Sequence, residues 1–331
     1  MRARMLSIAF GLAIGLTAAA AFGNQSAQHT PGGDAPPVPT LRRGLNLSHW
    51  FAQARSAQGY NQQHLTAHTM ASDMHPTPDF KKALARDDSY VERFADFWRD
   101  LAGRFAGLPV ERVVFEILNE PEFEDRYRWS GVQAKLLAGI RQAAPRHTAI
   151  VSGHRWASIE ELLSLEPVRD ANVIYNFHFY LPQIFTHQGA AWGRPFWRHL
   201  AAVPYPSSSD NVAPVADALS DDVSRLLVTR YGYEQWSGAR IRAEIQQVAV
   251  WAKKRNVRVT CNEFGVYRRV APAGDRVRWI ADVRTALEMH GIGWTMWDYA
   301  GDFGLVTKQS GQIVVDQPIV SALGLGSDAT R

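Results

Sequence analysis

Short apolar runs alternate along the chain with longer stretches in which apolar residues recur every three or four positions. The short runs predict buried strands, and the longer stretches predict amphipathic helices. The expected strands are Leu41–His49, Arg112–Leu118, Thr148–Ser152, Val173–Phe179, Val257–Asn262 and Ile292–Trp297. The expected helices are Ser89–Ala106, Trp129–Ala143, Ile241–Arg255 and Asp275–His290. Strands that alternate with helices in this way predict an α/β fold with a parallel sheet.

Two glutamates lie at the ends of expected strands. Each is followed by a residue that interrupts regular structure, Pro121 in one case and Gly265 in the other. Glu120 lies in the run FEILNEP (Phe115–Pro121), and Glu263 lies in TCNEFG (Thr260–Gly265). Barrel enzymes keep their chemistry at the C-terminal ends of parallel strands. Two facing carboxylates are what glycosidic-bond hydrolysis needs, because one protonates the leaving oxygen and the other attacks the sugar carbon. The alternative is that the two glutamates form unrelated surface salt bridges.

A long connection follows the expected strand that ends at Phe179. Strict alternation in that strand places His178 and Tyr180 on one face. About sixty residues rich in Pro, Gly, Trp and Tyr then separate Tyr180 from the helix that begins at Ile241. A connection of this length is usually functional or separately folded. We expect it to wall one side of a cleft.

Composition limits the possible partners. The chain has 331 residues, of which 46% are hydrophobic, which is enough for one large domain with a single core. The formal net charge is only +4 and no block of Lys or Arg occurs, so we expect no nucleic-acid partner. Cys261 is the only cysteine, so no internal disulfide can form. We interpret Cys261 as a buried structural residue, because no base partner is specified for a thiol nucleophile.

The first 23 residues have the pattern of a secretory signal peptide. Arg2 and Arg4 supply the positive charge, Met5–Leu16 is apolar, and small residues follow. The alternative is a membrane anchor, but the apolar stretch is short for a span. Residues 24–40 predict a flexible linker because they are rich in proline and glycine. We expect a secreted or periplasmic protein whose folded domain covers residues 41–331, without stable membrane insertion.

The chain resembles the retaining glycoside hydrolases of family 5, the cellulase-type (β/α)8 barrels, from about Leu41 to Leu325. The family's opening strand motif is matched by Arg43–Leu47 (RGLNL). Four further elements follow in the family's order at the ends of strands three, four, six and seven: Asp73–His75, Asn119–Pro121, His178–Tyr180 and Glu263–Gly265. The Asn-Glu-Pro motif alone is weakly specific, but the ordered set is strongly specific.

The resemblance implies a role for each matched residue. Glu120 would be the acid/base and Glu263 the nucleophile, acting without a metal or cofactor. The expected substrate-binding residues are His75, Asn119, His178, Tyr180 and Trp297. Asn119 would hold the 2-hydroxyl of the sugar, and Trp297, in preference to Trp294, would floor the subsite at the cleavage point.

The proposed chemistry sets requirements on these side chains. Glu120 must be protonated and Glu263 ionised, so their surroundings have to separate the two pKa values. Tyr180 and His178 could donate hydrogen bonds that keep Glu263 ionised. A tryptophan face suits the apolar face of a pyranose ring, so Trp297 fits a sugar subsite.

Four of these assignments have alternatives. His178, Tyr180 and Trp297 could instead be satisfied core residues. His75 with Asp73 could suggest a metal site, although no third ligand lies nearby in the sequence.

The spacing of the first motifs is too short for a complete barrel. Asn46 and His75 are 29 positions apart, whereas two βα units need about 62. Residues 52–72 are too polar to supply strands, and the family's Arg-x-Pro, whose arginine hydrogen-bonds the nucleophile, has no counterpart. We therefore expect an incomplete (β/α)8 barrel that lacks about one βα unit, with residues 52–72 irregular.

The leading hypothesis is a secreted, monomeric retaining β-glycosidase that hydrolyses β-glucan or a related polysaccharide, most simply an endo-β-1,4-glucanase. The alternative is a catalytically impaired or inactive glycan-binding protein on the same fold. An esterase is a weaker hypothesis, because the chain lacks a Gly-x-Ser-x-Gly motif.

Overall fold

The computed structural model describes residues 41–45, 78–309 and 312–326, and within them six parallel strands form one sheet. The strands are β1 (Arg43–Leu45), β2 (Val114–Glu116), β3 (Thr148–Ser152), β4 (Val173–Phe179), β5 (Val259–Phe264) and β6 (Gly293–Met296). Their order across the sheet is β1-β6-β5-β4-β3-β2. All residues of β3 and β4 are buried, as expected for strands of a parallel sheet covered by helices.

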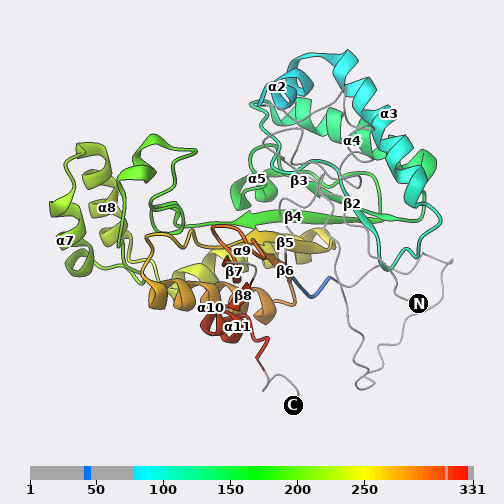
Figure 1. The fold of residues 1–331 in the computed structure, drawn as a ribbon. Coiled ribbons are helices and arrows are strands. Elements are labelled where there is room, and N and C mark those ends of the chain that lie inside the picture. Colours follow the sequence, from blue (N-terminus) through cyan, green and yellow to red (C-terminus); the bar gives the residue numbers. More distant parts are fainter. Residues whose placement is uncertain (1–40, 46–77, 310–311, 327–331) are drawn as a thin grey trace.

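Helices cover the sheet and extend from one of its ends (Figure 1). They are α2 (Pro78–Arg86), α3 (Asp88–Phe105), α4 (Arg126–Ala143), α5 (Ile159–Ser164), α6 (Gln183–Thr186), η3 (Pro195–His199), α7 (Ser209–Ala218), α8 (Asp222–Glu234), α9 (Gly238–Arg255), α10 (Ala273–Met289) and α11 (Gln317–Ala322). In Figure 1, α2 to α4 lie together at the upper right, α9 to α11 lie below the sheet, and α7 and α8 project to the left.

Capping residues and rows of buried apolar side chains explain why the residues of α3 and α4 form helices. Asp87 and Asp125 accept hydrogen bonds from the first turns of α3 and α4, which satisfies backbone donors that a helix start leaves open. Apolar residues of α3 recur at helical spacing and are buried against the sheet.

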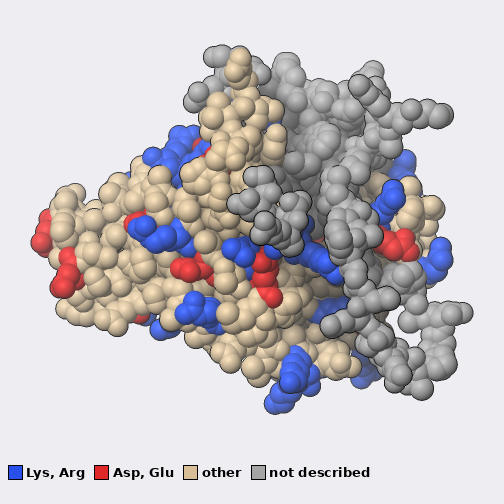
Figure 2. All heavy atoms as spheres, turned by 90° about the horizontal axis from the view of Figure 1, so that it is seen from below, with Lys and Arg blue, Asp and Glu red and all other residues tan. Residues whose placement is uncertain are grey.

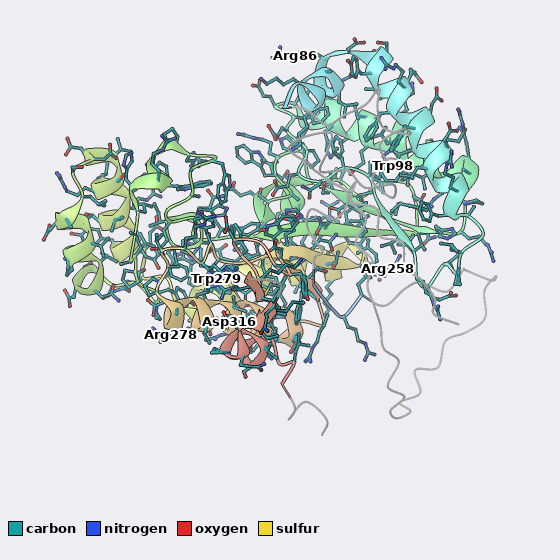
Figure 3. The ribbon with its side chains drawn as sticks, in the orientation of Figure 1. Arg86, Trp98, Arg258, Arg278, Trp279 and Asp316 are labelled. Carbon is teal, nitrogen blue, oxygen red and sulfur yellow. The ribbon has the colours of Figure 1, made fainter. Side chains whose placement is uncertain are left out.

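Three buried tryptophans attach helices to the ends of strands. The indole of Trp98 in α3 donates a hydrogen bond to the carbonyl of Ile117, just after β2. The indole of Trp129 in α4 donates to Ser152 O at the end of β3, and that of Trp279 in α10 donates to Leu181 O after β4. Figure 3 shows Trp98 and Trp279 in place. These bonds fix the strand ends that carry the site described below.

The described strands form part of a (β/α)8-type barrel that is open on one side. β1 pairs with β6, and β2 pairs with β3, but no strand among the described residues links β1 to β2. The expected incomplete barrel is therefore confirmed. Residues 52–72, the Asp73–His75 element, the expected signal peptide and the expected linker all lie outside the described residues.

Several elements were not expected from the sequence. They include α2, α5, α11 and a hairpin of β7 (Val306–Gln309) and β8 (Gln312–Val315). The long connection after Tyr180 contains α6, η3, α7 and α8.

Charges of both signs are interspersed over the face shown in Figure 2. No helix among the described residues is long and apolar enough to cross a bilayer.

Candidate active site

Three side chains meet at the C-terminal ends of their strands. Glu120 follows β2, His178 lies near the end of β4, and Glu263 lies near the end of β5. One carboxylate oxygen of each glutamate and one ring nitrogen of His178 lie within 4.8 Å of one another. Nδ1 of His178 is 3.0 Å from Glu120 Oε1 and 3.6 Å from Glu263 Oε2. The fold thus brings together the two glutamates predicted from the sequence.

Tyr180 completes this cluster from the residue just after β4. Its hydroxyl donates a hydrogen bond to Glu263 Oε2 over 3.0 Å. Its ring packs edge-on against His187 and Phe303, with centroid distances of 5.1 and 6.0 Å. These contacts hold the phenol against the carboxylate.

A β-bulge on β5 turns two consecutive side chains, Asn262 and Glu263, towards the interior of the barrel. Phe177 pairs with Cys261, but the next residue, His178, pairs with Glu263, so that Asn262 is an extra residue. Successive side chains of a regular strand point to opposite faces, and a bulge interrupts this alternation. Asn262 consequently donates to a buried carboxylate of β2, while Glu263 faces His178.

The backbone of Glu120 adopts a left-handed conformation. Its φ is +46°, which is uncommon for a residue other than glycine and persists only where the surroundings enforce it. Lys81 of α2 donates from Nζ to both the carbonyl of Glu120 and Oε1 of Glu122, each over 2.8 Å. The neighbouring Asn119 is exposed, and so it is accessible to a ligand. His75 lies outside the described residues.

His178 and Glu120 form a charged pair. Burial lowers the pKa of His178, but the carboxylates of Glu263 and Glu120 reverse this effect and raise the pKa to about 9. Burial raises the pKa of Glu120, but the hydrogen bond and the positive charge of His178 outweigh it, so the net shift is downward. At neutral pH, His178 is therefore a cation beside an ionised Glu120.

Glu263 has the opposite shift. Burial raises its pKa to about 7, and the nearby carboxylates of Glu120 and Glu116 add to the rise against the charge of His178 and the hydrogen bond of Tyr180. Within the described part of the chain, no arginine forms a hydrogen bond or ion pair with Glu263. The free site therefore favours a proton on Glu263, the reverse of the sequence-based expectation. The expectation differs because it assumed that hydrogen bonds to Glu263 would outweigh its burial.

The same three side chains also form a set that could hold a metal ion, since two carboxylates and an imidazole converge within 4.8 Å. A histidine binds a metal only after it loses its proton. Because the pKa of His178 is raised to about 9, its proton opposes metal binding at neutral pH. The cluster therefore fits an ion pair better than a metal centre.

Aromatic residues extend the site beyond Tyr180. Trp192, in the connection after β4, is 47% exposed. Its ring packs edge-on against Tyr267 at 4.9 Å and lies beside Phe303 at 6.3 Å. The first part of the long connection thus contacts the aromatic residues beside Tyr180, whereas α7 and α8 extend away from the sheet (Figure 1).

Trp297 and Trp294 differ in their surroundings. Trp294 is 2% exposed and packs against Phe264, and so it belongs to the core. Trp297 is half-buried and follows the end of β6. Its carbonyl approaches Gly265 so closely that a Cβ there would lie 2.4 Å away, which explains the glycine after the Glu263 motif. Trp294 therefore has no exposed face for a sugar, and the role of Trp297 in the site stays a prediction.

Sequence reasoning missed five residues of the site region: Glu116, Asn176, His187, Trp192 and Asn262. Glu116 could have been found, because an acidic residue inside an apolar strand, four positions before Glu120, needs a partner. Trp192 lies in a connection without periodicity, so no pattern marked it.

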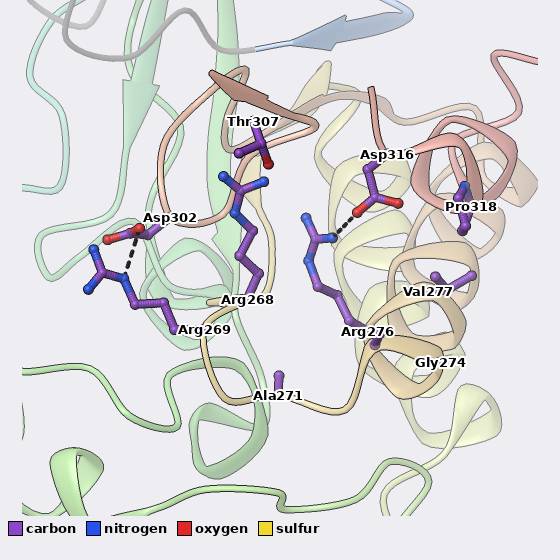
Figure 4. A pocket seen from close by; sticks show the side chains of 11 residues that line it. Arg268, Arg269, Ala271, Gly274, Arg276, Val277, Asp302, Thr307, Asp316 and Pro318 are labelled. Carbon is purple, nitrogen blue, oxygen red and sulfur yellow. Dashed lines mark hydrogen bonds and ion pairs between the residues drawn. The ribbon is translucent and has the colours of Figure 1, made fainter. Parts of the chain in front are cut away.

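A separate cavity of about 640 Å³ lies beside the start of α10 (Figure 4). Its arginines are engaged: Arg269 pairs with Asp302, and Arg276 pairs with Asp316. Glu120 and Glu263 do not line this cavity.

A comparison with protein families assigns the chain. The model described as Cellulase (glycosyl hydrolase family 5) matches residues 69–302, a region that contains both strand-end glutamates. The chain belongs to glycoside hydrolase family 5.

Relatives of this family 5 chain are named endoglucanases. Endoglucanase 3 of Fibrobacter succinogenes is 29% identical over 254 residues, which are 75% of this chain and 38% of that protein. Endoglucanase C of Acetivibrio thermocellus is 29% identical over 233 residues, 69% of this chain and 66% of that protein. The chain thus spans less than two thirds of the length of either relative.

Solved structures agree with the family assignment. A hyperthermophilic endo-beta-1,4-glucanase in complex with substrate superimposes with a TM-score of 0.60 and is 25% identical, covering 83% of this chain and 82% of that one.

Proposed function

We propose that this family 5 chain is a retaining β-glycosidase that hydrolyses internal β-1,4 bonds of a glucan. The observation that carries the proposal is the approach of Glu120 and Glu263, whose oxygens lie within 4.8 Å of each other and of His178. Carboxyl groups about 5–5.5 Å apart are typical of retaining enzymes, whereas inverting enzymes leave room for a water. The relatives named endoglucanases support the choice of a β-1,4-glucan.

The reaction would proceed in two displacements. In the first, the ionised carboxylate of Glu263 attacks the anomeric carbon while Glu120 gives its proton to the leaving sugar oxygen. In the second, Glu120 removes a proton from water, the water attacks the anomeric carbon, and the bond to Glu263 breaks. Glu120 ends the cycle protonated and Glu263 ends it ionised, as each began.

For the first displacement, Glu120 and Glu263 must together hold one proton, and that proton must lie on Glu120. The free site favours Glu263 instead, because burial raises the pKa of Glu263 and His178 lowers that of Glu120. The two groups titrate as a unit, so the productive form is a minor fraction of the singly protonated pair. The hydrogen bond from Tyr180 to Glu263 supports that fraction, because it favours the ionised form.

Exposed and half-buried side chains around the pair would bind the sugar. Asn119 is exposed next to Glu120 and would hold the 2-hydroxyl. Trp297 and Trp192 would offer aromatic faces to pyranose rings on either side of the cleaved bond. Because Trp192 is held by Tyr267 and Phe303, its side chain has little rotational freedom to lose on binding.

A second candidate function is glycan binding with impaired turnover. The raised pKa of Glu263 and the lack of an arginine partner among the described residues favour it. In this alternative the aromatic side chains still bind the polysaccharide, but the nucleophile is rarely ionised while Glu120 is protonated.

Export to the periplasm or the medium is part of the proposal. It rests on the charged start, the apolar stretch Met5–Leu16 and the small residues that follow. A polymeric glucan is too large to enter a cell intact, which is consistent with an exported enzyme.

Hydrolysis of a soluble β-1,4-glucan distinguishes the two candidates. The wild-type chain is assayed beside Glu120→Gln and Glu263→Gln, with Tyr233→Ala as a control for an exposed aromatic residue far along α8. Reducing ends that form with the wild type and the control, but with neither glutamine variant, support hydrolysis. Binding of the glucan without any release of reducing ends supports the second candidate, and hydrolysis by all variants contradicts both.

A further inference from the structure

A buried carboxylate lies beneath the two catalytic glutamates and is not part of the proposed reaction. Glu116 ends β2 and is 5% exposed. Its Oε1 accepts a hydrogen bond from Asn176 Nδ2 over 2.9 Å, and its Oε2 accepts one from Asn262 Nδ2 over 3.0 Å. Both asparagines are almost completely buried, so a carboxylate at this place needs these partners.

The two asparagines are also joined to each other. Oδ1 of Asn176 accepts a hydrogen bond from the backbone N–H of Asn262 over 3.0 Å. That N–H belongs to Asn262, the extra residue of the β5 bulge, which the bulge leaves without a partner on β4 in the ladder. Glu116, Asn176 and Asn262 therefore form a closed triangle, here called the bulge clamp, that joins β2, β4 and β5.

The bulge clamp acts at the residue that precedes the proposed nucleophile. The bulge turns Glu263 towards Tyr180 and His178, and a regular strand would turn it to the opposite face. We propose that Glu116 is a positioning residue that holds the β5 bulge through Asn262 and Asn176 and thereby orients Glu263 for attack. This inference rests on the proposed function of Glu263 as nucleophile.

The orientation of each hydrogen bond in the clamp is fixed. Both oxygens of Glu116 accept hydrogen bonds from asparagine Nδ2 atoms, and the ionised form of Glu116 has no proton of its own to donate. Asn176 cannot reverse its amide without losing the bond to the N–H of Asn262. Glu116→Gln therefore replaces one acceptor with a donor that faces another donor, and one bond of the clamp is lost.

A paired substitution restores the pattern. In Glu116→Gln/Asn262→Asp, the introduced amide can donate to the introduced carboxylate and still accept from Asn176, so all bonds of the triangle return. A matched control is Thr148→Val, which removes the hydrogen bond that the buried Thr148 donates to Asn172 at the other end of β3.

The test compares kcat and KM on a soluble β-1,4-glucan for these variants. We expect Glu116→Gln to lower kcat about a hundredfold with KM nearly unchanged, because a small misplacement of a reacting group has that effect. The paired variant should recover most of the loss, and Thr148→Val should keep the wild-type kcat. A folded Glu116→Gln variant with wild-type kcat overturns the proposal, as does a folded paired variant that recovers nothing.

Crystal structures of the same variants give a readout that needs no activity. The distance from the Tyr180 hydroxyl to the Glu263 carboxylate should stay within hydrogen-bond reach in the wild type and the paired variant and exceed it in Glu116→Gln. An inactive wild type would refute the proposed function, and these distances would still decide the role of the clamp. If Glu116→Gln does not fold, the paired variant decides alone: an intact Tyr180–Glu263 contact supports the clamp, and a lost contact overturns it.

Discussion

Nδ1 of His178 lies 3.0 Å from Oε1 of Glu120, although the two residues come from strands that are separated by β3 in the sheet. Such a contact requires a sheet that curves, so that side chains of non-adjacent strands meet inside. It also gives the site a fixed positive charge, because the pKa of His178 is raised to about 9 by the carboxylates around it, against its burial. The positive charge of His178 lowers the pKa of Glu120 and so affects which glutamate of the site holds a proton.

The pH dependence of kcat/KM should show an alkaline decline centred near pH 7. The catalytic pair must hold one proton, and it loses the last one as the pH rises through the pKa of Glu263, which burial and the nearby carboxylates raise to about 7. On the acid side, the fall in activity should lie below the usual titration range of a glutamate, because the hydrogen bond and the charge of His178 lower the pKa of Glu120. His178 keeps its charge through the pH range of both declines, because its pKa is raised to about 9. Burial raises the pKa of Glu116 to about 7, so Glu116 loses its proton over the same pH range as the alkaline decline. Initial rates from pH 4 to 9 test this, and a rate that climbs through pH 7 to a maximum at pH 8 or above would contradict it.

Thermal stability should fall as the pH rises from 5 to 8. The folded-state pKa of Glu263 is raised from 4.5 to about 7, chiefly by burial, so its contribution to stability is complete below pH 4.5 and is lost as the pH passes 7. Glu263→Gln cannot ionise and should show a smaller fall, with a difference on the order of 1–3 kcal/mol in the free energy of unfolding. Melting curves at several pH values decide the matter, since equal slopes for both proteins would refute a raised pKa.

Removal of the Trp192 ring should weaken substrate binding rather than the chemical step. The ring is 47% exposed. It contacts Phe303, whose ring in turn contacts Tyr180. We expect Trp192→Ala to raise KM about tenfold and to leave kcat within about twofold. Tyr233→Ala, at a more exposed aromatic residue of α8, should change neither constant. A fall in kcat at constant KM would show that Trp192 supports the catalytic residues instead.

Removal of the proposed nucleophile should be rescued by a small anion. Glu263→Ala leaves a space next to the anomeric carbon, and azide can enter it and attack in place of the carboxylate. We expect no hydrolysis by this variant in buffer and measurable formation of a glycosyl azide when azide is added. Chromatography of the products provides the measurement, and the assignment fails if Glu263→Ala is fully active without azide.

The sequence predicted the central strands and the four long helices α3, α4, α9 and α10 more accurately than the remaining elements. Thr148–Ser152 and Val173–Phe179 are strands with the predicted bounds, because continuous apolar runs are required where both faces of a sheet are covered. The helices α7 and α8 and the hairpin of β7 and β8 were missed, because they are short, partly exposed elements with weak periodicity.

The convergence of four predicted site residues was foreseen, but their electrostatics were not. Glu120, His178, Tyr180 and Glu263 were identified by their positions at strand ends, and the fold brings them together. The direction of the pKa shift of Glu263 depends on its burial and on the distances to neighbouring carboxylates, which a sequence does not contain. The bulge at Asn262 escaped prediction for a related reason, since it exists only in the pairing of two strands.

The most direct test of the account is to trap the covalent intermediate. A 2-deoxy-2-fluoro-β-cellobioside with a good leaving group is incubated with the wild-type chain, and the digested protein is analysed by mass spectrometry. A retaining mechanism with Glu263 as nucleophile predicts one added glycosyl group, located on Glu263, and none in Glu263→Gln. Hydrolysis of β-1,4-glucan by a protein that acquires no label, or that carries the label on Glu120 or another residue, would contradict the retaining mechanism with Glu263 as nucleophile.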